Sequence, residues 1–486
     1  MNQTRRAWLL RAGVAVGVLV AVVLYWLLPI RGQVTIAPDS AWAEPWPRWR
    51  ISQDNSRGGA VTVQISDVVG WRYVLATVNG RPIPVQVWST LAPGYYTWAF
   101  VLPTLPADQP AEVVFYHDCD TGCQRRSSFT LNAGAATPVS QVLLPTKLGA
   151  VDASPSRNWH GRASWDVALT YARLAAQDYW GVDHLAWRVH QAEAAGLRVL
   201  VRVDYDQGQS LPPVDDAEAV AEYLSYLRRL AGDERFNGVY GYVLGSGYNE
   251  LSSNSLDPQH AVTPAWYARL FNGYGLPPAQ TDNAVQIVRA ENPAVRLLVG
   301  PVRPWVTDQD GAQRAALDAP WLNYFQTLVS ALDAGAQAKQ AAGYALAAPD
   351  GFALHAPGRV GAWGAAEPQT DQPLAEWNGA QAGFRVYRDW LAVINSVPGT
   401  RGLPAFITST NTFVAAEGVM PAQNYPPGWL AAALAEINAQ PQVQALCWFL
   451  DADGSGDPRW DGFSLSAGQG RLAEAAAEFD ALLRGP

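Results

Sequence analysis

The chain has 486 residues, of which 49% are hydrophobic, with 34 basic and 43 acidic side chains and a net charge of −9. The hydrophobic content is enough for large cores and excludes a wholly disordered chain. Only two of the bases are lysines, Lys147 and Lys339. An acidic chain without clustered cations excludes nucleic acid as its main partner. The 21 tryptophans and 19 tyrosines suit core packing and also contact with sugar rings.

A long apolar run follows the first arginines of the chain. Arg5, Arg6 and Arg11 precede residues 12–30, which carry no charge. At 1.5 Å per residue such a helix is about 28 Å long, close to the thickness of the hydrocarbon core. The arginines place the N-terminus in the cytoplasm. We expect residues 1–31 to be a cytoplasmic tail and transmembrane signal anchor, with the rest of the chain periplasmic or extracellular. A cleaved signal peptide is the alternative.

Small residues in this run indicate how the anchor could meet other proteins. Gly13 and Gly17 lie four residues apart. That spacing lets a neighbouring helix approach closely, although small residues are also common in helices that face only lipid. The expected partners are therefore membrane lipid and, as one possibility, other subunits of a membrane complex.

From residue 33 to 145 the pattern is a period-two alternation interrupted by Gly, Pro and Asn. The clearest runs are Ala60–Ser66, Trp71–Val78, Val85–Trp88, Tyr95–Leu102, Glu112–Tyr116 and Ser127–Leu131. Asn79-Gly80, between two of these runs, is a hairpin signal. Short strands at this spacing, without a helical stretch, predict an immunoglobulin-like β-sandwich. It resembles the accessory modules of secreted carbohydrate-active proteins, as a spacer, a protein-docking module or a sugar-binding module.

Two cysteines of this region lie four residues apart. Cys119 and Cys123 stand in a turn-rich segment between two strand-like runs. In an oxidising compartment they could form a disulfide. Half of a zinc site is the alternative, but no second Cys or His pair has matching spacing. Cys447, in an apolar run, is predicted to be a buried thiol.

After residue 146 short apolar strands alternate with amphipathic helices. The predicted strands are Leu148–Asp152, Trp165–Thr170, Leu197–Val203, Val239–Gly245, Val295–Pro301, Phe352–His355, Pro404–Ser409 and Val443–Leu450. The predicted helices are Val182–Ala195, Asp215–Gly232, Ala279–Glu291, Trp321–Ala338, Ala380–Asn395, Pro427–Asn438 and Gly470–Leu483. Eight such strands predict an α/β fold, a (β/α)8 TIM barrel over residues 147–486. Residues 153–164 are too few for a full first crossover helix.

Function in such a barrel lies where the strands end. The fourth strand ends in Gly245-Ser246-Gly247-Tyr248-Asn249-Glu250, the sixth at His355, the seventh in Thr408-Ser409 and the eighth near Trp448. These ends resemble the retaining glycoside hydrolases with (β/α)8 barrels, of cellulase and β-xylosidase type. The resemblance implies an Asn-Glu acid/base after strand four and a Thr-Glu nucleophile after strand seven. It also implies a tryptophan floor under the reactive sugar after strand eight.

The two catalytic positions depart from that pattern. Ser409 stands where the resemblance implies the nucleophile, and a serine hydroxyl without a neighbouring base does not replace a carboxylate. If Gly245 and Asn249 are kept in step with the family, Gly247 takes the acid/base position. A second register places Asn249-Glu250 on the Asn-Glu pair and leaves Glu250 as a fallback catalytic residue. We therefore expect a degenerate, non-catalytic barrel.

Other side chains complete the candidate set. The candidates for substrate binding are Tyr248, Asn249, Trp305, His355 and Trp448. An inverting mechanism could pair Glu250 with Asp204 or Asp206. Polar residues that merely solvate the barrel mouth are the competing interpretation.

The loop after the eighth predicted strand resembles the first half of a calcium loop. Its carboxylates are Asp451, Asp453 and Asp457, but position 12 is Gly462 rather than a glutamate. An ordinary turn-rich loop is the stronger interpretation, so no cofactor is expected. The sequence as a whole predicts a membrane-anchored, extracytoplasmic, glycosidase-like protein. It would bind carbohydrate or serve as an accessory subunit, with an active hydrolase as the alternative.

Overall fold

The structure is a computed structural model. It describes nine strands between residues 31 and 132 and, from residue 144 to 485, all residues except 155, 174–179, 261, 307–318, 359–367, 415–417 and 454–456. The chain divides into two compact units, Met1–Gln141 and Val142–Pro486. The predicted anchor and the pair Cys119 and Cys123 lie outside the described residues. Among the residues that are described, no helix is long and apolar enough to cross a bilayer.

The first unit contains two β-sheets. The five-stranded sheet has the order β1 (Arg31–Thr35), β9 (Arg125–Asn132), β8 (Ala111–His117), β4 (Leu75–Val78) and β5 (Arg81–Ile83). The four-stranded sheet has the order β2 (Trp49–Asp54), β3 (Ala60–Asp67), β7 (Tyr96–Leu102) and β6 (Gln86–Ser89). Strand β1 runs parallel to β9, and the other neighbours are antiparallel. Strands form at all six of the alternating runs. The immunoglobulin-like assignment stays a prediction.

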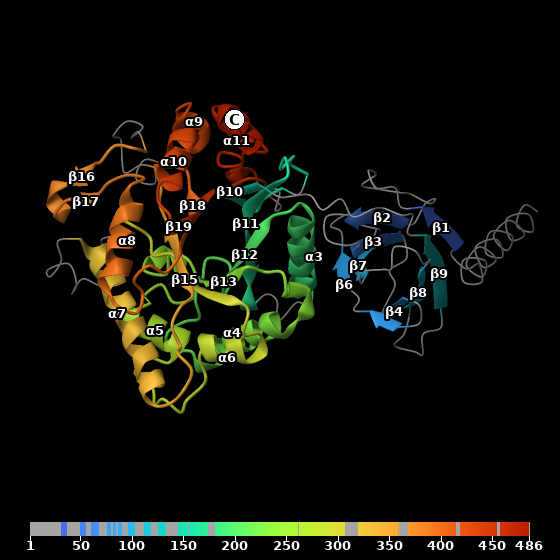
Figure 1. Cartoon of the computed structure of the whole chain (residues 1–486), viewed down its shortest axis with the longest axis horizontal. Helices are drawn as coiled ribbons and strands as arrows, with labels where there is room; N and C mark the ends of the chain where they lie inside the picture. Colours follow the sequence, from blue (N-terminus) through green and yellow to red (C-terminus); the bar gives the residue numbers. More distant parts are fainter. Residues whose placement is uncertain are drawn as a thin grey trace, which may run out of the picture. The chain divides into compact units, whose positions relative to one another are not determined.

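The second unit is built on a closed barrel of eight parallel strands (Figure 1). In barrel order these are β10 (Leu144–Val151), β11 (Arg162–Tyr171), β12 (Arg198–Asp204), β13 (Gly241–Leu244), β14 (Arg296–Val299), β15 (Gly351–His355), β18 (Ala405–Thr410) and β19 (Val443–Trp448). Every neighbouring pair is parallel, and β19 closes onto β10. The predicted TIM barrel is confirmed.

Helices connect and surround these strands. They are α3 (Trp180–Ala194), α4 (Ala217–Gly232), α5 (Pro264–Asn272), α6 (Ala284–Glu291), α7 (Pro320–Ala341), α8 (Val386–Ser396), α9 (Pro421–Asn424), α10 (Trp429–Asn438) and α11 (Leu472–Arg484). Helix α5 was not predicted, although Thr263 caps it and Pro264 begins it. The predicted helix from Ala380 is corrected, because β17 (Ala380–Gln381) pairs with β16 (Pro373–Leu374) and α8 starts only at Val386.

The first crossover has no helix among its described residues, as the sequence predicted. Trp159 of this connection is buried and packs edge-on against Phe479 of α11, with ring centroids 6.0 Å apart. The Arg157 guanidinium lies over the same phenyl ring, 5.1 Å from its centroid. The first crossover is therefore packed against the C-terminal helix.

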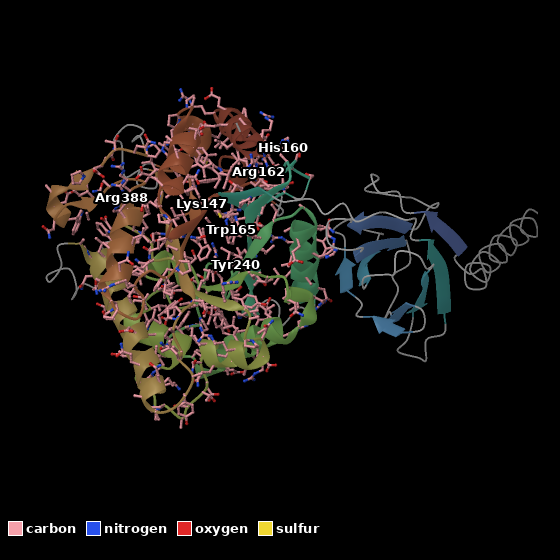
Figure 2. All side chains as sticks on the ribbon, in the orientation of Figure 1. Lys147, His160, Arg162, Trp165, Tyr240 and Arg388 are labelled. Atoms are coloured by element: carbon pink, nitrogen blue, oxygen red, sulfur yellow. The ribbon has the colours of Figure 1, made fainter. Side chains whose placement is uncertain are left out.

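The N-terminal end of the barrel is closed by aromatic rings. Trp165 contacts Tyr240 and Phe406 with centroid distances of 4.9 and 5.4 Å. Figure 2 labels Trp165 and Tyr240 among the side chains of the second unit. Arg198 lies 3.8 Å above the Trp165 ring, and Arg296 lies 4.2 Å above Tyr240. We call these five side chains the barrel base. The base leaves the opposite end as the open end of the barrel. Further along the interior, Cys447 is a buried free thiol, as predicted.

Candidate functional site

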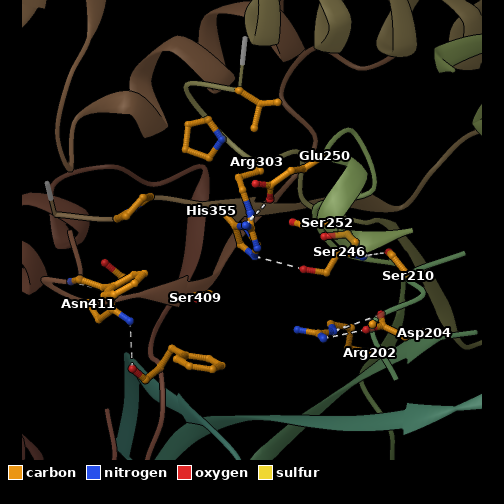
Figure 3. Close-up of a pocket in the computed structure, with 18 of the residues that line it drawn as sticks. Arg202, Asp204, Ser210, Ser246, Glu250, Ser252, Arg303, His355, Ser409 and Asn411 are labelled. Carbon is orange, nitrogen blue, oxygen red and sulfur yellow. Dashed lines mark hydrogen bonds and ion pairs between the residues drawn. The ribbon is translucent and has the colours of Figure 1, made fainter. Parts of the chain in front are cut away.

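A cavity of about 860 Å³ opens at the C-terminal ends of the strands (Figure 3). We call it the mouth cavity. Side chains from the ends of β12, β15 and β18 line it, together with residues of the loops after β12, β13, β14, β18 and β19. Among the described lining residues, the charged side chains are Arg202, Asp204, Glu250 and Arg303. The volume is within the range of pockets that take small ligands.

The turn after β13 depends on two glycines. Gly245 and Gly247 have φ values of 69° and 66°, which side chains of L-residues rarely adopt. A Cβ on Gly245 would lie 2.9 Å from Leu211 Cγ. The amide of Ser246, between the glycines, donates a 2.6 Å hydrogen bond to Ser210 Oγ. The position that resembles the acid/base is therefore a left-handed residue in a tight turn, so a glutamate there would strain the backbone.

Arg303 occupies the space beside Gly247. A Cβ built on Gly247 would be 3.5 Å from Arg303 Nε. The Arg303 guanidinium forms an ion pair with the Glu250 carboxylate, and both side chains are partly exposed to the cavity. Figure 3 shows these two side chains pointing toward each other, beside His355. A cation thus lies where the resemblance implies an acid.

The residue before Glu250 holds the backbone of Arg303. The side chain of Asn249 accepts a 2.8 Å hydrogen bond from the Arg303 amide and donates a 3.0 Å bond to its carbonyl oxygen. Asn249 is 1% exposed and does not line the cavity. The structure therefore places Asn249 behind the site, where it positions Arg303 rather than a ligand.

The second carboxyl group in the cavity is also paired with an arginine. Asp204, at the end of β12, accepts hydrogen bonds of 3.2 Å from Arg202 Nε and 2.7 Å from Arg202 Nη2. Burial raises the pKa of Asp204, and the neighbouring guanidinium opposes that rise. Both carboxyl groups among the described lining residues are thus matched by a cation.

His355 lies within electrostatic reach of both arginines. Its Nε2 is 3.3 Å from Ser246 Oγ, which links the ends of β15 and β13 across the mouth cavity. Burial and the positive charges of Arg303 and Arg202 lower the pKa of His355 to about 3. The imidazole is therefore neutral at physiological pH, with one nitrogen that donates and one that accepts hydrogen bonds. His355 lines the mouth cavity, and its role in substrate binding stays a prediction.

Ser409 lines the cavity as expected from strand seven, and it pairs in register with His355 of the neighbouring strand. Its hydroxyl is neutral and can only exchange hydrogen bonds. Trp305 also lines the cavity, and its indole nitrogen donates a 2.9 Å hydrogen bond to the Gln381 carbonyl. This bond fixes the ring at the wall of the cavity.

The expected place of Trp448 is corrected. Successive residues of a strand point to opposite sides. Cys447 faces the barrel interior, whereas Trp448 points outward, is fully buried and packs against Tyr425 and Trp429. The next residue, Phe449, lines the mouth cavity instead. An aromatic residue does line the cavity at the end of the eighth barrel strand, as expected. It is Phe449, one position after Trp448.

Phe449 belongs to an aromatic wall of four residues. Its ring is 5.8 Å from Trp460 and 5.9 Å from Phe463, and Phe413 is 5.1 Å from Phe463. Trp460 is 37% exposed, so part of its indole is open to a ligand. This wall was not predictable from the strand pattern because all four of its members lie beyond the strand ends. Arg202 and Arg303 were not predictable either, because only their closeness to carboxylates marks them as part of the site.

Tyr248 does not reach the cavity. It is fully buried, stacks on Tyr267 at 4.5 Å and donates a 3.0 Å hydrogen bond to the Gly300 carbonyl. Its place therefore corrects the expectation that it would meet a ligand there.

The carboxylates of the candidate calcium loop form hydrogen bonds with other groups of the protein. Asp451 is fully buried and accepts hydrogen bonds from Arg157 and from the Ser154 amide, at 2.8 Å for the latter. Asp457 accepts a 3.0 Å bond from the Arg459 amide, and Asp453 accepts one of 3.0 Å from the Asp457 amide. Within the described parts of the chain, no group of three or more His, Cys, Asp or Glu side chains could hold a metal ion. The described carboxylates of this loop hold the protein's own chain together.

No protein-family model matches this chain, and no curated protein matches it. Several solved structures are similar in fold. A Bacteroides ovatus GH5 xyloglucanase has 14% identity and a TM-score of 0.39, over 88% of this chain and 96% of that one. An Exiguobacterium marinum β-glucosidase has 10% identity and a TM-score of 0.39, over 67% and 84%. The family 44 endoglucanase Cel44A of Clostridium thermocellum has 12% identity and a TM-score of 0.36, over 66% and 75%. These similarities are remote, and function has to be argued from the residues of the cavity.

Proposed function

We propose that this chain is a membrane-anchored, extracytoplasmic, glycosidase-like protein that binds carbohydrate in the mouth cavity without hydrolysing it. One observation carries the proposal. The Arg303 guanidinium, paired with Glu250, lies beside Gly247, the position that resembles the acid/base. The position that resembles the nucleophile carries the hydroxyl of Ser409.

The chemistry of glycoside cleavage requires groups that this arrangement does not supply. A retaining mechanism uses two carboxyl groups about 5–5.5 Å apart, one as acid and one as nucleophile. Ser409 provides no carboxylate, and the left-handed backbone at Gly247 would be strained by the side chain of a glutamate. Glu250 is committed to its ion pair with Arg303. General acid catalysis alone contributes about 10²–10⁴-fold in rate, so its loss together with the nucleophile leaves no effective hydrolase.

Carbohydrate binding needs no catalytic carboxylate and can use the aromatic and hydrogen-bonding groups of the mouth cavity. The aromatic wall of Phe413, Phe449, Trp460 and Phe463 offers apolar ring faces. The polar groups of the cavity are Ser246, His355 and the two arginine–carboxylate pairs, which can donate and accept hydrogen bonds. A sugar ring has an apolar face and a rim of hydroxyl groups, and it needs both kinds of surface.

The experiment combines hydrolysis and binding on the same preparation. The purified full-length chain should not release nitrophenol from a panel of aryl β-glycosides above background, whereas it should bind neutral oligosaccharides in calorimetry. Ser409→Glu alone, and Gly247→Glu with Ser409→Glu, should not restore turnover. Turnover that disappears in Glu250→Gln would contradict the proposal and establish an active enzyme.

One observation favours that second candidate, an inverting hydrolase. The pKa of Asp204 is raised by burial, and a carboxylic acid with a raised pKa is what a general acid requires. Glu250 would then be the base that activates water. In this case Asp204→Asn and Glu250→Gln should each abolish turnover, which separates the two candidates in one assay.

The anchor and the assembly role form the second part of the proposal. The apolar run at 12–30, after three arginines, supports a signal anchor, and Gly13 with Gly17 supports contact with a second helix. The chain should remain in the membrane after a carbonate wash and copurify with other membrane proteins in mild detergent. A clean monomer after crosslinking in intact membranes would contradict the assembly role.

A further inference from the structure

The mouth cavity carries four charged side chains among its described residues, and they cancel. Arg202 is bound by Asp204 through two hydrogen bonds, and Arg303 is bound by Glu250. His355, which touches the same region, is 3.3 Å from Ser246 and contributes no charge of its own when it is neutral. A ligand that enters this cavity meets polar groups but no uncompensated charge.

The Glu250–Arg303 pair is held in place from both sides. Asn249 binds the amide and the carbonyl of Arg303 at 2.8 and 3.0 Å. The Glu250 amide donates a 2.9 Å bond to the Gly247 carbonyl, and the Glu250 carbonyl accepts a 2.9 Å bond from Asn254 Nδ2. Although Glu250 precedes the 3₁₀ helix Leu251–Ser253, its side chain makes no capping hydrogen bond there. The carboxylate is therefore free of a local structural duty and is directed to the guanidinium.

Both partners remain accessible. The Arg303 side chain is 46% exposed and that of Glu250 is 30% exposed. The Asp204–Arg202 pair is more enclosed, with exposures of 8% and 22%. Of the two pairs, the Glu250–Arg303 pair is thus the one that a ligand can reach, and removal of Glu250 would leave a preorganised, accessible cation in the cavity.

From this arrangement we propose that Glu250 is a specificity-determining residue, which neutralises Arg303 and restricts the mouth cavity to uncharged oligosaccharides. The inference rests on the proposed carbohydrate binding. A uronic acid would have to compete with Glu250 for the guanidinium or place its carboxylate beside that of Glu250. Like charges at such a distance repel. A neutral sugar can exchange hydrogen bonds with both members of the pair without separating them.

The test uses pairs of sugars that differ only in charge. Calorimetry on the full-length chain in detergent would compare cellotetraose with its C6-oxidised tetraglucuronate, and α-1,4-galactotetraose with tetragalacturonate. The wild type should bind a neutral member at least about tenfold more tightly than its acidic counterpart. Glu250→Gln should gain at least about tenfold in affinity for the acidic member, because charge-assisted hydrogen bonds to Arg303 become available.

Two variants make the result specific. The double variant Glu250→Gln with Arg303→Gln should lose the gained affinity for the acidic sugar. Glu291→Gln breaks an exposed ion pair with Arg228, 3.7 Å long and outside the cavity, and should behave as the wild type does. Circular dichroism melts would verify that each variant is folded.

The outcomes separate the two proposals. Tighter binding of an acidic sugar by the wild type, or no gain in Glu250→Gln, would overturn the role of Glu250. If the wild type bound neither member of either pair, the proposed carbohydrate binding would be contradicted. In that case a gain for the acidic sugar in Glu250→Gln, lost in the double variant, would still support Glu250 as the group that neutralises Arg303.

Discussion

The two ends of the barrel use arginine in opposite ways. At the barrel base, Arg198 and Arg296 lie flat over Trp165 and Tyr240, at 3.8 and 4.2 Å from the ring centroids. In the mouth cavity, Arg202 and Arg303 face carboxylates instead of rings. At the base, the planar guanidinium completes a packed aromatic layer; at the mouth, it is part of a polar surface.

This difference suggests that the barrel base serves stability and that the mouth cavity serves ligand recognition. The base is filled by interlocking rings, and a change of volume there disturbs many contacts. The mouth is hollow, and a change there removes few contacts but alters what a ligand meets. We therefore expect substitutions at the base to affect unfolding and those at the mouth to affect binding.

The largest effect is expected from Trp165→Ala at the base. Trp165 is fully buried against Tyr240, Phe406 and Arg198. Removal of the ring should lower the free energy of unfolding by roughly 3–5 kcal/mol, with little change in sugar affinity of the folded fraction. Guanidinium denaturation followed by fluorescence and circular dichroism would measure it. A loss below about 1 kcal/mol would show that the base is not the stabilising layer.

A buried carboxyl of barrel strand β11, on the side of the strand that faces away from the barrel interior, extends the comparison to pH. Burial raises the pKa of Asp166 to about 7, although Arg188 and the Ala153 amide oppose the rise. The pKa of Asp166 is higher in the folded chain than in the unfolded chain, where it is ~3.9. The contribution of Asp166 to stability is therefore full below pH ~3.9 and is lost as the pH rises through the folded pKa of about 7. Asp166→Asn should therefore gain about 4 kcal/mol of stability relative to the wild type between pH 4 and pH 8. Parallel pH profiles in urea denaturation would contradict this.

At the mouth, Trp460→Ala should weaken sugar binding with little loss of stability, whereas Trp165→Ala should lower stability with little change in sugar affinity. The indole is 37% exposed and contacts Phe449 and Phe463. Loss of an aromatic face should weaken binding of the best neutral tetrasaccharide about two- to tenfold, with a stability change below about 1 kcal/mol. Titration calorimetry and a thermal melt of the same sample would measure both quantities. A large stability loss with unchanged affinity would remove the distinction between base and mouth.

The smallest effect concerns His355. Burial and the two arginines lower its pKa to about 3, so the imidazole stays neutral as the pH rises from 5 to 9. Sugar affinity of the wild type and of His355→Gln should therefore change less than about twofold over this range. A step in wild-type affinity near pH 6–7 that is missing in the variant would show that His355 titrates in the cavity.

Much of the architecture followed from local patterns in the sequence. The eight barrel strands were predictable because buried parallel strands form short, continuous apolar runs, and each run was found as a strand. The short first crossover was also predictable, because 153–164 cannot hold a full helix between two loops. His355 and Ser409 were found at the mouth because both terminate strands whose direction in a barrel is fixed.

The chemistry of the site was decided by tertiary structure. A one-residue difference in strand register turned Trp448 to the outside and Phe449 to the cavity, which a sequence pattern at a strand end does not resolve. Asn249 and Glu250 are neighbours in the chain, yet they act on a residue more than fifty positions away, Arg303. The sequence by itself determined that a glycine and a serine stand at the two positions where the resemblance implies carboxylates. Only the fold decided that the Arg303 guanidinium lies beside Gly247, because that closeness arises between two loops that the barrel brings together.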